Sequence, residues 1–272
     1  MVRIGVVVFP GSNRDADAAA ALRLAGAEPV MLWHESADLQ GAAAVVLPGG
    51  FAYGDYLRAG AIARFSPVMR SVAAFAADGG LVLGICNGFQ VLAEAGLVPG
   101  ALLRNRSLRF VSRQIAIAPE RLDSPFTRAV GERRPLRMPV AHGEGCYYAD
   151  EATLDALERD GQILFRYVRD DGTPALDPDE RANPNGSLRA IAGVTNAAGN
   201  VAGLMPHPEA AVEAILGSDD GLLLMRSLVE SAAERLASGG PVSIADPAAS
   251  GSPVAIAVGP VAVGPVAVGG VR

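Results

Sequence analysis

A single cysteine stands where an apolar run meets an expected helix, in the stretch GLVLGICNGFQ. Cys86 lies between Gly84 and Gly88, and glycines on both sides allow the tight strand-to-helix turn of a nucleophile elbow, which exposes the central side chain. The N-terminus of the following helix has unpaired N–H groups and a positive dipole end, and both lower the pKa of a thiol. Cys86 is therefore a candidate nucleophile. A buried structural cysteine is the competing interpretation.

A thiol nucleophile needs a general base, and the chain has three histidines. His207 follows an apolar strand in the sequence LMPHPE, where the flanking prolines hold the backbone extended. His207 and Glu209 then project to the same side. The carboxylate can fix the imidazole tautomer while the other ring nitrogen takes the thiol proton. Cys86, His207 and Glu209 form a candidate triad, and a histidine that only caps the strand is the alternative.

The intermediate of such a reaction carries an oxyanion, which backbone N–H groups stabilise. The N–H of Asn87 would face this oxygen at the start of the helix. The turn LPGGFAYGD contains Gly49 and Gly50, whose backbone freedom lets a second N–H point at the substrate. We expect the two turns to lie together at the carboxyl ends of neighbouring strands.

Other histidine and cysteine positions favour no metal site. Cys86, His207 and Glu209 lack the spacing of metal ligands. His142 and Cys146, in AHGEGCYY, could bind a metal or simply pack, and the glycines at 143 and 145 indicate a loop that lies against a ligand. His34 is interpreted as structural.

The elements around these residues predict a doubly wound α/β fold. Short β-branched runs at residues 2–9, 43–47 and 81–85 are typical of buried parallel strands. Helical spacing is seen from Asp15 to Gly26 and from Ile62 to Asp78. Strands that alternate with helices imply right-handed βαβ units.

The second half of the chain predicts a mixed or antiparallel extension of the same sheet. Further strands are expected near residues 136–148, 162–168 and 188–196, and a last helix from Gly221 to Ser238. We expect one domain over residues 1–238. From residue 239 the repeated unit GPVAVG predicts a disordered, low-complexity tail at 239–272, which is either a tolerated extension or an interaction segment.

Composition excludes several classes of function. The chain has 272 residues and a formal net charge of −6, which weighs against nucleic acid or an anionic membrane as a partner. No secretory signal or membrane-spanning run is visible, so we expect a cytoplasmic protein. All basic residues are arginine, which excludes a Schiff-base lysine and a phosphate-loop lysine. The arginines at 104, 106, 109 and 113 favour a solvated strand face or a protein contact over phosphate binding.

Six longer stretches resemble a known family. They are FPGSNRDAD, LPGGFAYGDYLRAGAIA, GICNGFQVL, PVAHGEGCYY, NPNGSLRAIAGVTNAAGNVAGLMPHPE and LGSDDGLLL. The elbow and the PHPE motif resemble the class I, triad-type glutamine amidotransferases. The motifs YGDYLRAG, HGEG and NPNGS are similar to the glutaminase subunits of phosphoribosylformylglycinamidine synthase, an enzyme of purine biosynthesis. The resemblance implies a flavodoxin-like, doubly wound and mostly parallel sheet with an antiparallel extension.

The resemblance also implies roles for individual residues. Cys86 would attack the side-chain amide of glutamine, release ammonia and form a γ-glutamyl thioester that water hydrolyses. His207 would be the base and later the acid, and Glu209 would orient it. The N–H groups of Gly50 and Asn87 would form the oxyanion hole. The positions that resemble the glutamine contacts of the family are Gln90, His142, Gly143 and Glu144.

The family passes its ammonia to a synthetase subunit, with the help of a small third subunit. That synthetase uses ATP and magnesium to convert formylglycinamide ribonucleotide to formylglycinamidine ribonucleotide. The resemblance therefore implies glutamine and these two subunits as partners, and no cofactor in this chain. The lack of lysine and of a phosphate loop is compatible with this division of labour.

Two positions depart from the family pattern: Ala210 replaces the usual arginine after PHPE, and Cys146 replaces a polar residue. Two other hypotheses remain open. A hydrolase or stress protein of similar fold would share the cysteine elbow, but it would not need the His-x-Glu pair together with HGEG. A catalytically silent regulatory subunit would not need the triad.

Overall fold

The structure is a computed structural model that describes residues 1–178 and 181–240. Its strands are β1 (Arg3–Val8), β2 (Glu28–Trp33), β3 (Ala44–Leu47), β4 (Leu81–Ile85), β5 (Ala101–Leu103), β6 (Val111–Pro119), β7 (Leu136–His142), β8 (Cys146–Tyr148), β9 (Ile163–Tyr167), β10 (Ile191–Thr195) and β11 (Val201–Leu204). Its α-helices are α1 (Asp15–Leu24), α2 (Pro67–Ala77), α3 (Asn87–Glu94), α4 (Glu151–Arg159) and α5 (Asp220–Ala237).

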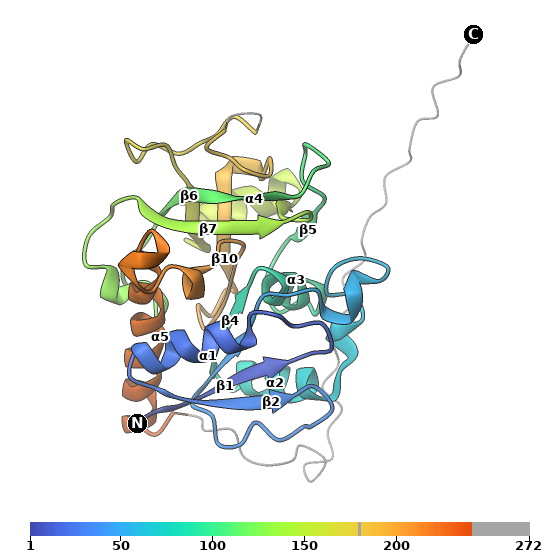
Figure 1. Cartoon of the computed structure of the whole chain (residues 1–272), viewed down its shortest axis with the longest axis vertical. Coiled ribbons are helices and arrows are strands. Elements are labelled where there is room, and N and C mark those ends of the chain that lie inside the picture. Colours follow the sequence, from blue (N-terminus) through green and yellow to red (C-terminus); the bar gives the residue numbers. More distant parts are fainter. Residues whose placement is uncertain (179–180, 241–272) are drawn as a thin grey trace.

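A nine-stranded sheet with the order β2-β1-β3-β4-β11-β10-β9-β6-β7 runs through the molecule (Figure 1). The strands from β2 to β11 in this order are parallel, and the remaining strands pair antiparallel. Strands β5 and β8 form a separate antiparallel pair. This arrangement confirms the predicted α/β sheet with an antiparallel extension.

Helices cover both faces of the parallel part. Right-handed crossovers place α1 on one face and α2 on the other, because β1 and β3 connect to neighbours on opposite sides. Helix α1 packs against α5, and both α2 and α3 contact a 3₁₀ turn at Ala63–Phe65 (Figure 1). Among the described residues, no helix has both the length and the apolar character needed to cross a bilayer.

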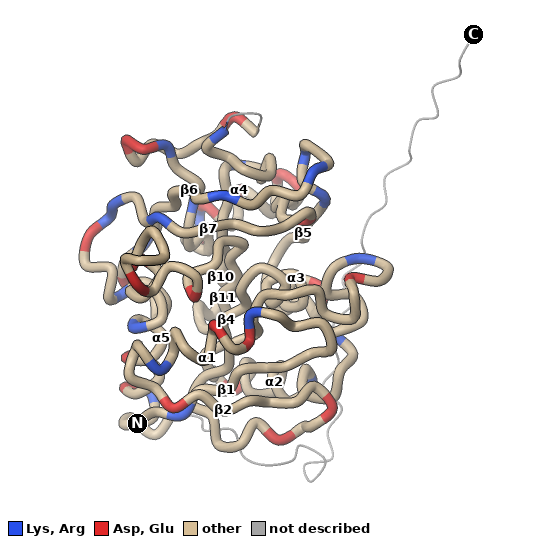
Figure 2. The backbone as a smooth tube through the Cα atoms, viewed as in Figure 1, with Lys and Arg blue, Asp and Glu red and all other residues tan. Residues whose placement is uncertain are grey.

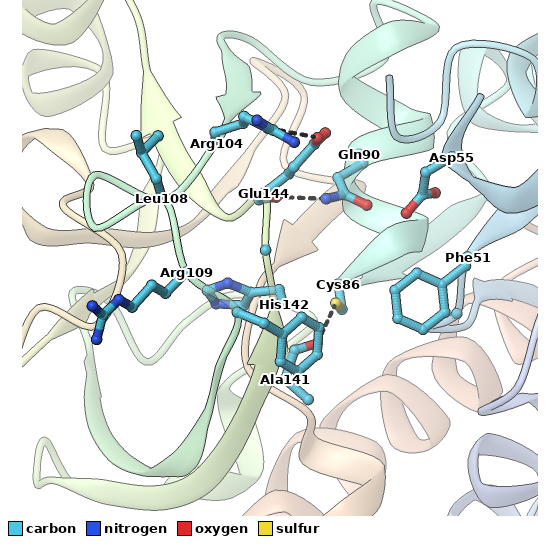
Figure 3. A pocket seen from close by; sticks show the side chains of 13 residues that line it. Phe51, Asp55, Cys86, Gln90, Arg104, Leu108, Arg109, Ala141, His142 and Glu144 are labelled. Carbon is cyan, nitrogen blue, oxygen red and sulfur yellow. Dashed lines mark hydrogen bonds and ion pairs between the residues drawn. The ribbon is translucent and has the colours of Figure 1, made fainter. Parts of the chain in front are cut away.

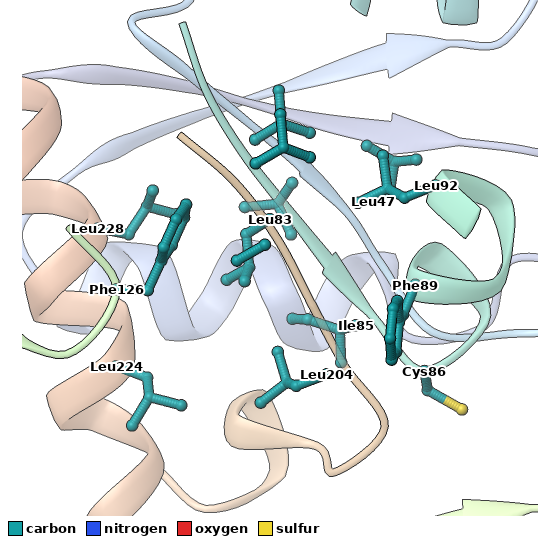
Figure 4. Packing of buried hydrophobic residues seen from close by; sticks show 14 of the residues in the cluster. Leu47, Leu83, Ile85, Cys86, Phe89, Leu92, Phe126, Leu204, Leu224 and Leu228 are labelled. Atoms are coloured by element: carbon teal, nitrogen blue, oxygen red, sulfur yellow. The ribbon is translucent and has the colours of Figure 1, made fainter. Parts of the chain in front are cut away.

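The hydrophobic core lies on both sides of β4. Ile85 and Leu204 extend between Leu224 of α5 and Phe89 of α3, and Cys86 stands at the edge of this cluster (Figure 4). The central strands β4 and β11 contain no charged residue, and the charged residues are mainly in the surrounding loops and helices (Figure 2). The core therefore fixes the strand ends that carry the candidate nucleophile and base.

Three glycines let α3 approach the sheet closely. A Cβ on Gly203 would lie 2.0 Å from Phe89, a Cβ on Gly84 would lie 2.6 Å from Leu92, and one on Gly88 would lie 2.0 Å from the Leu47 oxygen. Real Cβ atoms do not approach other atoms so closely, so a larger residue at any of these positions would push the helix away. The position of the elbow depends on this close packing.

Some predicted boundaries were wrong. The helix expected from Ile62 begins only at Pro67, because Ser66 is extended at φ −60° and ψ 143° and a residue before proline disfavours the helical region. The strand expected over 136–148 is divided into β7 and β8, and the segment 188–196 begins with a 3₁₀ turn, Leu188–Ala190. Helix α4 was not predicted.

The last helix ends at Ala237, close to the predicted Ser238. Most of the predicted tail, residues 241–272, lies outside the part of the chain that the structure describes.

Candidate active site

The ends of three neighbouring strands bring the candidate residues together. In the sheet register, Leu47 of β3 pairs with Gly84 of β4, and Gly84 pairs with Gly203 of β11. The segments that follow contain the Gly49–Gly50 turn, Cys86 and His207. Because the strands are parallel, all three segments leave the sheet at the same edge, as the sequence predicted.

The turn at Cys86 is strained in an unexpected way. Cys86 itself has φ 50° and ψ −104°, whereas Gly84 and Gly88 do not have positive φ. A left-handed φ at a non-glycine residue costs free energy and is concentrated at functional sites. The two glycines allow the tight turn, as predicted, because a Cβ on either would collide with the backbone around it. They provide space for α3, and the nucleophile carries the unusual backbone angle.

The backbone of β7 anchors the other side of the site. The N–H of His207 donates to the carbonyl oxygen of Pro139 at 2.9 Å. The Cys86 thiol points at the carbonyl oxygen of Ala141, with Sγ 3.8 Å away. The thiol and imidazole thus share one support, the strand that leads into the His142 loop.

His207 and Glu209 form a buried pair. Nδ1 of His207 lies 2.5 Å from Oε1 of Glu209, and each residue is 3% exposed. Among the described residues, three buried side-chain nitrogen or oxygen atoms lack a hydrogen-bond partner, and two of them are His207 Nε2 and Glu209 Oε2. Buried polar atoms without partners are rare in proteins. The free Nε2 is the atom that a general base uses.

Burial alone would lower the pKa of His207, but the charge and hydrogen-bonding atoms of Glu209 and of the Cys86 sulfur outweigh it and raise the pKa to about 10. The imidazole therefore favours its protonated form. Gly49 lies against the same ring, since a Cβ there would be 2.7 Å from His207 Cε1. Only glycine leaves room for the imidazole at this point of the turn.

A cavity of about 250 Å³ opens beside Cys86 (Figure 3). It is lined by Gly50, Phe51, Asp55, Cys86, Gln90, Arg104, Leu108, Arg109, Phe110, Ala141, His142, Gly143 and Glu144. The candidate residues Gly50, Cys86, Gln90, His142, Gly143 and Glu144 are all part of this lining. His207 and Glu209 are not in the lining.

The amide side chains of Asn87 and Gln90 connect the loops around the cavity. Asn87 Oδ1 accepts from the Ala52 N–H at 3.0 Å, and Asn87 Nδ2 donates to Gln90 Oε1 at 3.0 Å. Gln90 Nε2 donates to the carbonyl oxygen of Glu144 at 2.5 Å. The glycine turn, the elbow helix and the HGEG loop are therefore held in one arrangement. The N–H of Asn87 begins α3 and has no acceptor within the helix.

His142 has a different environment from His207. Its Nδ1 lies 3.1 Å from Asn105 Oδ1, and its Nε2 lies 3.4 Å from Asn185 Nδ2. Burial and the nearby His207 lower the pKa of His142 to about 3. The ring is thus neutral, and each of its nitrogens contacts an amide side chain.

Cys146 packs rather than reacts. Its thiol donates to the carbonyl oxygen of Gly186 at 3.2 Å, and burial raises its pKa. Within residues 1–178 and 181–240, no group of three histidine, cysteine or acidic side chains is arranged to hold a metal ion. The packing interpretation of His142 and Cys146 therefore fits their contacts.

Sequence reasoning missed part of the lining. The strand-face interpretation of the arginine run was wrong for Arg104 and Arg109, which line the cavity from the turn between β5 and β6. Only Arg113 of that run lies in a strand. Asp55 also lines the cavity, and the motif YGDYLR was the available signal for it.

His34 lies away from the cavity lining. Its Nδ1 and the Tyr53 hydroxyl are 2.8 Å apart, and that hydroxyl is 3.0 Å from Ser66 Oγ. These contacts agree with the structural role expected for His34.

Comparisons with known proteins identify the class. A family model of the CobB/CobQ-like glutamine amidotransferase domain matches residues 1–219. The fold and this match define a glutamine amidotransferase domain.

Individual relatives show which family of glutamine amidotransferases the chain belongs to. The chain is 56% identical over 231 residues to phosphoribosylformylglycinamidine synthase subunit PurQ of Rubrobacter xylanophilus, covering 85% of this chain and 99% of that protein. It is 56% identical over 228 residues to the PurQ subunit of Salinibacter ruber, covering 84% and 95%. A chain in the structure of PurLQS from Thermotoga maritima matches with a TM-score of 0.72 and 41% identity, over 84% of this chain and 98% of that chain. The chain belongs to the PurQ family of phosphoribosylformylglycinamidine synthase subunits, as the sequence motifs predicted.

Proposed function

We propose that the chain is the glutaminase subunit of a phosphoribosylformylglycinamidine synthase, with Cys86 as the nucleophile. The observation that carries the proposal is the strained elbow of Cys86 beside the buried His207–Glu209 pair, whose Nε2 has no partner among the described residues. The PurQ relatives support glutamine as the substrate. The intact site and the close relatives weigh against a stress protein or a silent subunit.

The first half of the reaction uses the free nitrogen of His207. The Cys86 thiol gives its proton to His207 Nε2, and the sulfur forms a bond with the amide carbon of glutamine. Glu209 stabilises the imidazolium that results. The C–N bond then breaks, His207 returns the proton to the leaving nitrogen, and ammonia departs from a γ-glutamyl thioester.

The second half repeats the same steps with water. His207 takes a proton from water, whose oxygen attacks the thioester carbon, and the Cys86 thiolate leaves. The products are glutamate and the regenerated thiol. In both halves the N–H groups of Gly50 and Asn87 stabilise the oxyanion, and each donor lowers the barrier by roughly 2.7–4 kcal/mol.

The ammonia passes to partner subunits. The matching chain in the structure of PurLQS from Thermotoga maritima covers 84% of this chain, and the name PurLQS indicates a complex with other subunits. We assign the corresponding synthetase and small third subunit to this chain as partners. ATP and magnesium belong to the synthetase, in an assembly that works in the cytoplasm. The amidotransferase domain spans residues 1–238, and the tail from 239 is an extension without a catalytic role.

Covalent labelling tests the proposal. The purified chain is treated with a glutamine analogue whose side-chain amide is replaced by a chloroketone, with and without the synthetase subunits. Intact mass and peptide mapping should find one adduct on Cys86, and free glutamine should block it. Adduct formation that glutamine does not block, or that falls on Cys146, would contradict the proposal.

A matched variant separates reactivity from exposure. In His207→Gln, Cys86 keeps its place in the elbow but loses its base, so labelling should slow by about 10²-fold or more. Unchanged labelling would show that His207 does not activate the thiol.

A further inference from the structure

One acidic side chain in the cavity has no role in the triad. Asp55 lines the same cavity as Cys86, and it lies on the side of Gln90 opposite Glu144 (Figure 3). It belongs to a short 3₁₀ segment, Ala52–Asp55, that follows the glycine turn. Asp55 has φ 54° and Tyr53 has φ 55°, so two non-glycine residues in this segment are left-handed. This strained backbone holds the Asp55 carboxylate against the cavity instead of letting it extend into solvent.

The contacts of Asp55 leave one oxygen available. Oδ1 accepts from Asn87 Nδ2 at 3.3 Å. No other described residue donates to the carboxylate, and Oδ2 has no partner in the part of the chain that the structure describes. Asn87 itself is fixed by Ala52 and Gln90, so the carboxylate has a firm support on one side only.

The other carboxylate of the cavity is already occupied. Glu144 Oε2 accepts from the Ala59 N–H at 3.4 Å, and Glu144 Oε1 lies 3.7 Å from Arg104 Nε. Burial first, and then the negative charge of Glu144, raise the pKa of Asp55 to about 6. Two carboxylates near each other in a half-buried site attract a cation. Asp55 is the one with a free oxygen to bind it.

The substrate of the proposed function supplies such a cation. Free glutamine carries an α-ammonium at the end opposite to the amide that Cys86 attacks. Glutamine within a peptide chain lacks this charge, as does an analogue without the α-amino group. A carboxylate in the lining of the same cavity, apart from the nucleophile, therefore distinguishes free glutamine from both.

We propose that Asp55 binds the α-ammonium of glutamine and makes the site selective for the free amino acid. This inference rests on the proposed glutaminase function. Asn87 orients the carboxylate through Oδ1, and Oδ2 receives the ammonium. The same Asn87 begins the helix at the nucleophile, so binding of the ammonium end and alignment of the amide end share one residue.

The experiment compares two substrates in the assembly with the synthetase subunits. One is glutamine, and the other is glutaramate, which has the same amide and carboxylate but no α-ammonium. The kcat/KM for each is measured by ammonia release, for the unsubstituted chain and for Asp55→Asn. The substitution should lower the preference for glutamine over glutaramate by about 10- to 100-fold, the usual effect of losing a hydrogen bond to a charged group.

Two controls keep the result specific. Asp170→Asn removes an exposed carboxylate that pairs with Arg137 outside the cavity lining, and it should leave the preference unchanged. Asp55→Glu keeps the charge and should restore part of the preference. A second measurement is the rate at which chloroketone analogues with and without the α-amino group label Cys86, which needs no partner subunit.

The outcomes separate two failures. If Asp55→Asn lowers kcat/KM equally for both substrates, Asp55 only supports the turn and the inference is overturned. If the unsubstituted assembly releases no ammonia from glutamine and Cys86 is not labelled, the proposed function fails and this inference with it.

Discussion

The chain contains two cysteines, each with a histidine near it, and the two sets have opposite properties. Cys86 and His207 lie at the ends of parallel strands, where Nε2 of the imidazole has no partner among the described residues and the pKa of His207 is raised to about 10. Cys146 and His142 lie in the antiparallel part, where both are hydrogen-bonded and the pKa of His142 falls to about 3. Residue type alone therefore does not determine reactivity. The partner of each imidazole does.

The partners differ because the two regions are built differently. His207 receives a carboxylate from its own PHPE turn, two residues away. His142 receives neutral amides from Asn105 and Asn185, which come from separate loops. A carboxylate favours the charged imidazolium, whereas burial among neutral amides favours the neutral ring.

The strongest test of this contrast exchanges sulfur for oxygen in each pair. Cys86→Ser should lower the glutaminase kcat of the assembly by a factor of about 10⁴ or more, because a serine hydroxyl is a much weaker nucleophile beside the same base. Cys146→Ser should keep kcat within about threefold, because its thiol only donates to Gly186. Comparable losses in both variants would show that the two pairs act as a unit.

The next effect concerns the partner of the base. Glu209→Gln keeps the size and shape of the side chain, which can still form a hydrogen bond with His207, but it removes the negative charge. The kcat should therefore fall by about 10³- to 10⁴-fold. The pKa of His207, followed by NMR of the labelled imidazole, should fall at the same time. Asn185→Ala, which removes the partner of His142 Nε2, should change kcat by less than tenfold. A small effect of Glu209→Gln would mean that Glu209 has no part in catalysis.

Part of this contrast was visible in the sequence. The elbow, the PHPE turn and the alternation of strands and helices are local patterns, and the structure has them where they were expected. Helix α4, which was not predicted, also has a local signal. Asp150 caps it by accepting from the Thr153 N–H at 2.9 Å, and Leu154 and Leu157 are buried.

The rest depends on contacts between distant segments. The amides that bind His142 belong to residues 105 and 185, and no spacing rule connects these positions to residue 142. The position of Asp55 depends on a left-handed backbone conformation at a non-glycine residue, and no sequence pattern indicates this conformation. Such features follow from the packing of the whole fold rather than from its local patterns.

The neutral state of His142 predicts a dependence of stability on pH. In the unfolded chain its pKa is near 6.5, and in the folded chain it is about 3, so the unfolded state binds an additional proton between these values. Stability therefore falls as the pH decreases through this window, by up to about 1.4 kcal/mol per pH unit. The His142→Gln variant has no imidazole that titrates at this position. Between pH 6.0 and 4.5 its free energy of unfolding should therefore fall by about 2 kcal/mol less than that of the unsubstituted chain.

Denaturant unfolding at several pH values measures this difference. Cys146→Ser is the matched control, because it changes the same cluster without removing an imidazole, and its pH slope should equal that of the unsubstituted chain. Equal slopes for His142→Gln and the unsubstituted chain would contradict a neutral buried His142.

The third histidine, His34, extends the comparison of the histidine partners, and we expect the smallest effect when its partner is changed. Among the described residues, the side chain of His34 contacts no carboxylate or amide side chain; it contacts the hydroxyl of Tyr53, which also contacts Ser66. Tyr53 belongs to the left-handed segment that leads from Gly50 to Asp55. Tyr53→Phe should cost about 1 kcal/mol of stability and lower kcat/KM for glutamine by about two- to fivefold, because the turn that carries the proposed oxyanion-hole residue Gly50 and part of the cavity wall loses its anchor. Steady-state kinetics of the assembly checks the second value. An unchanged kcat/KM would mean that the Asn87 contacts alone hold the turn, and that His34 serves only the packing of the segment after β2 against the start of α2.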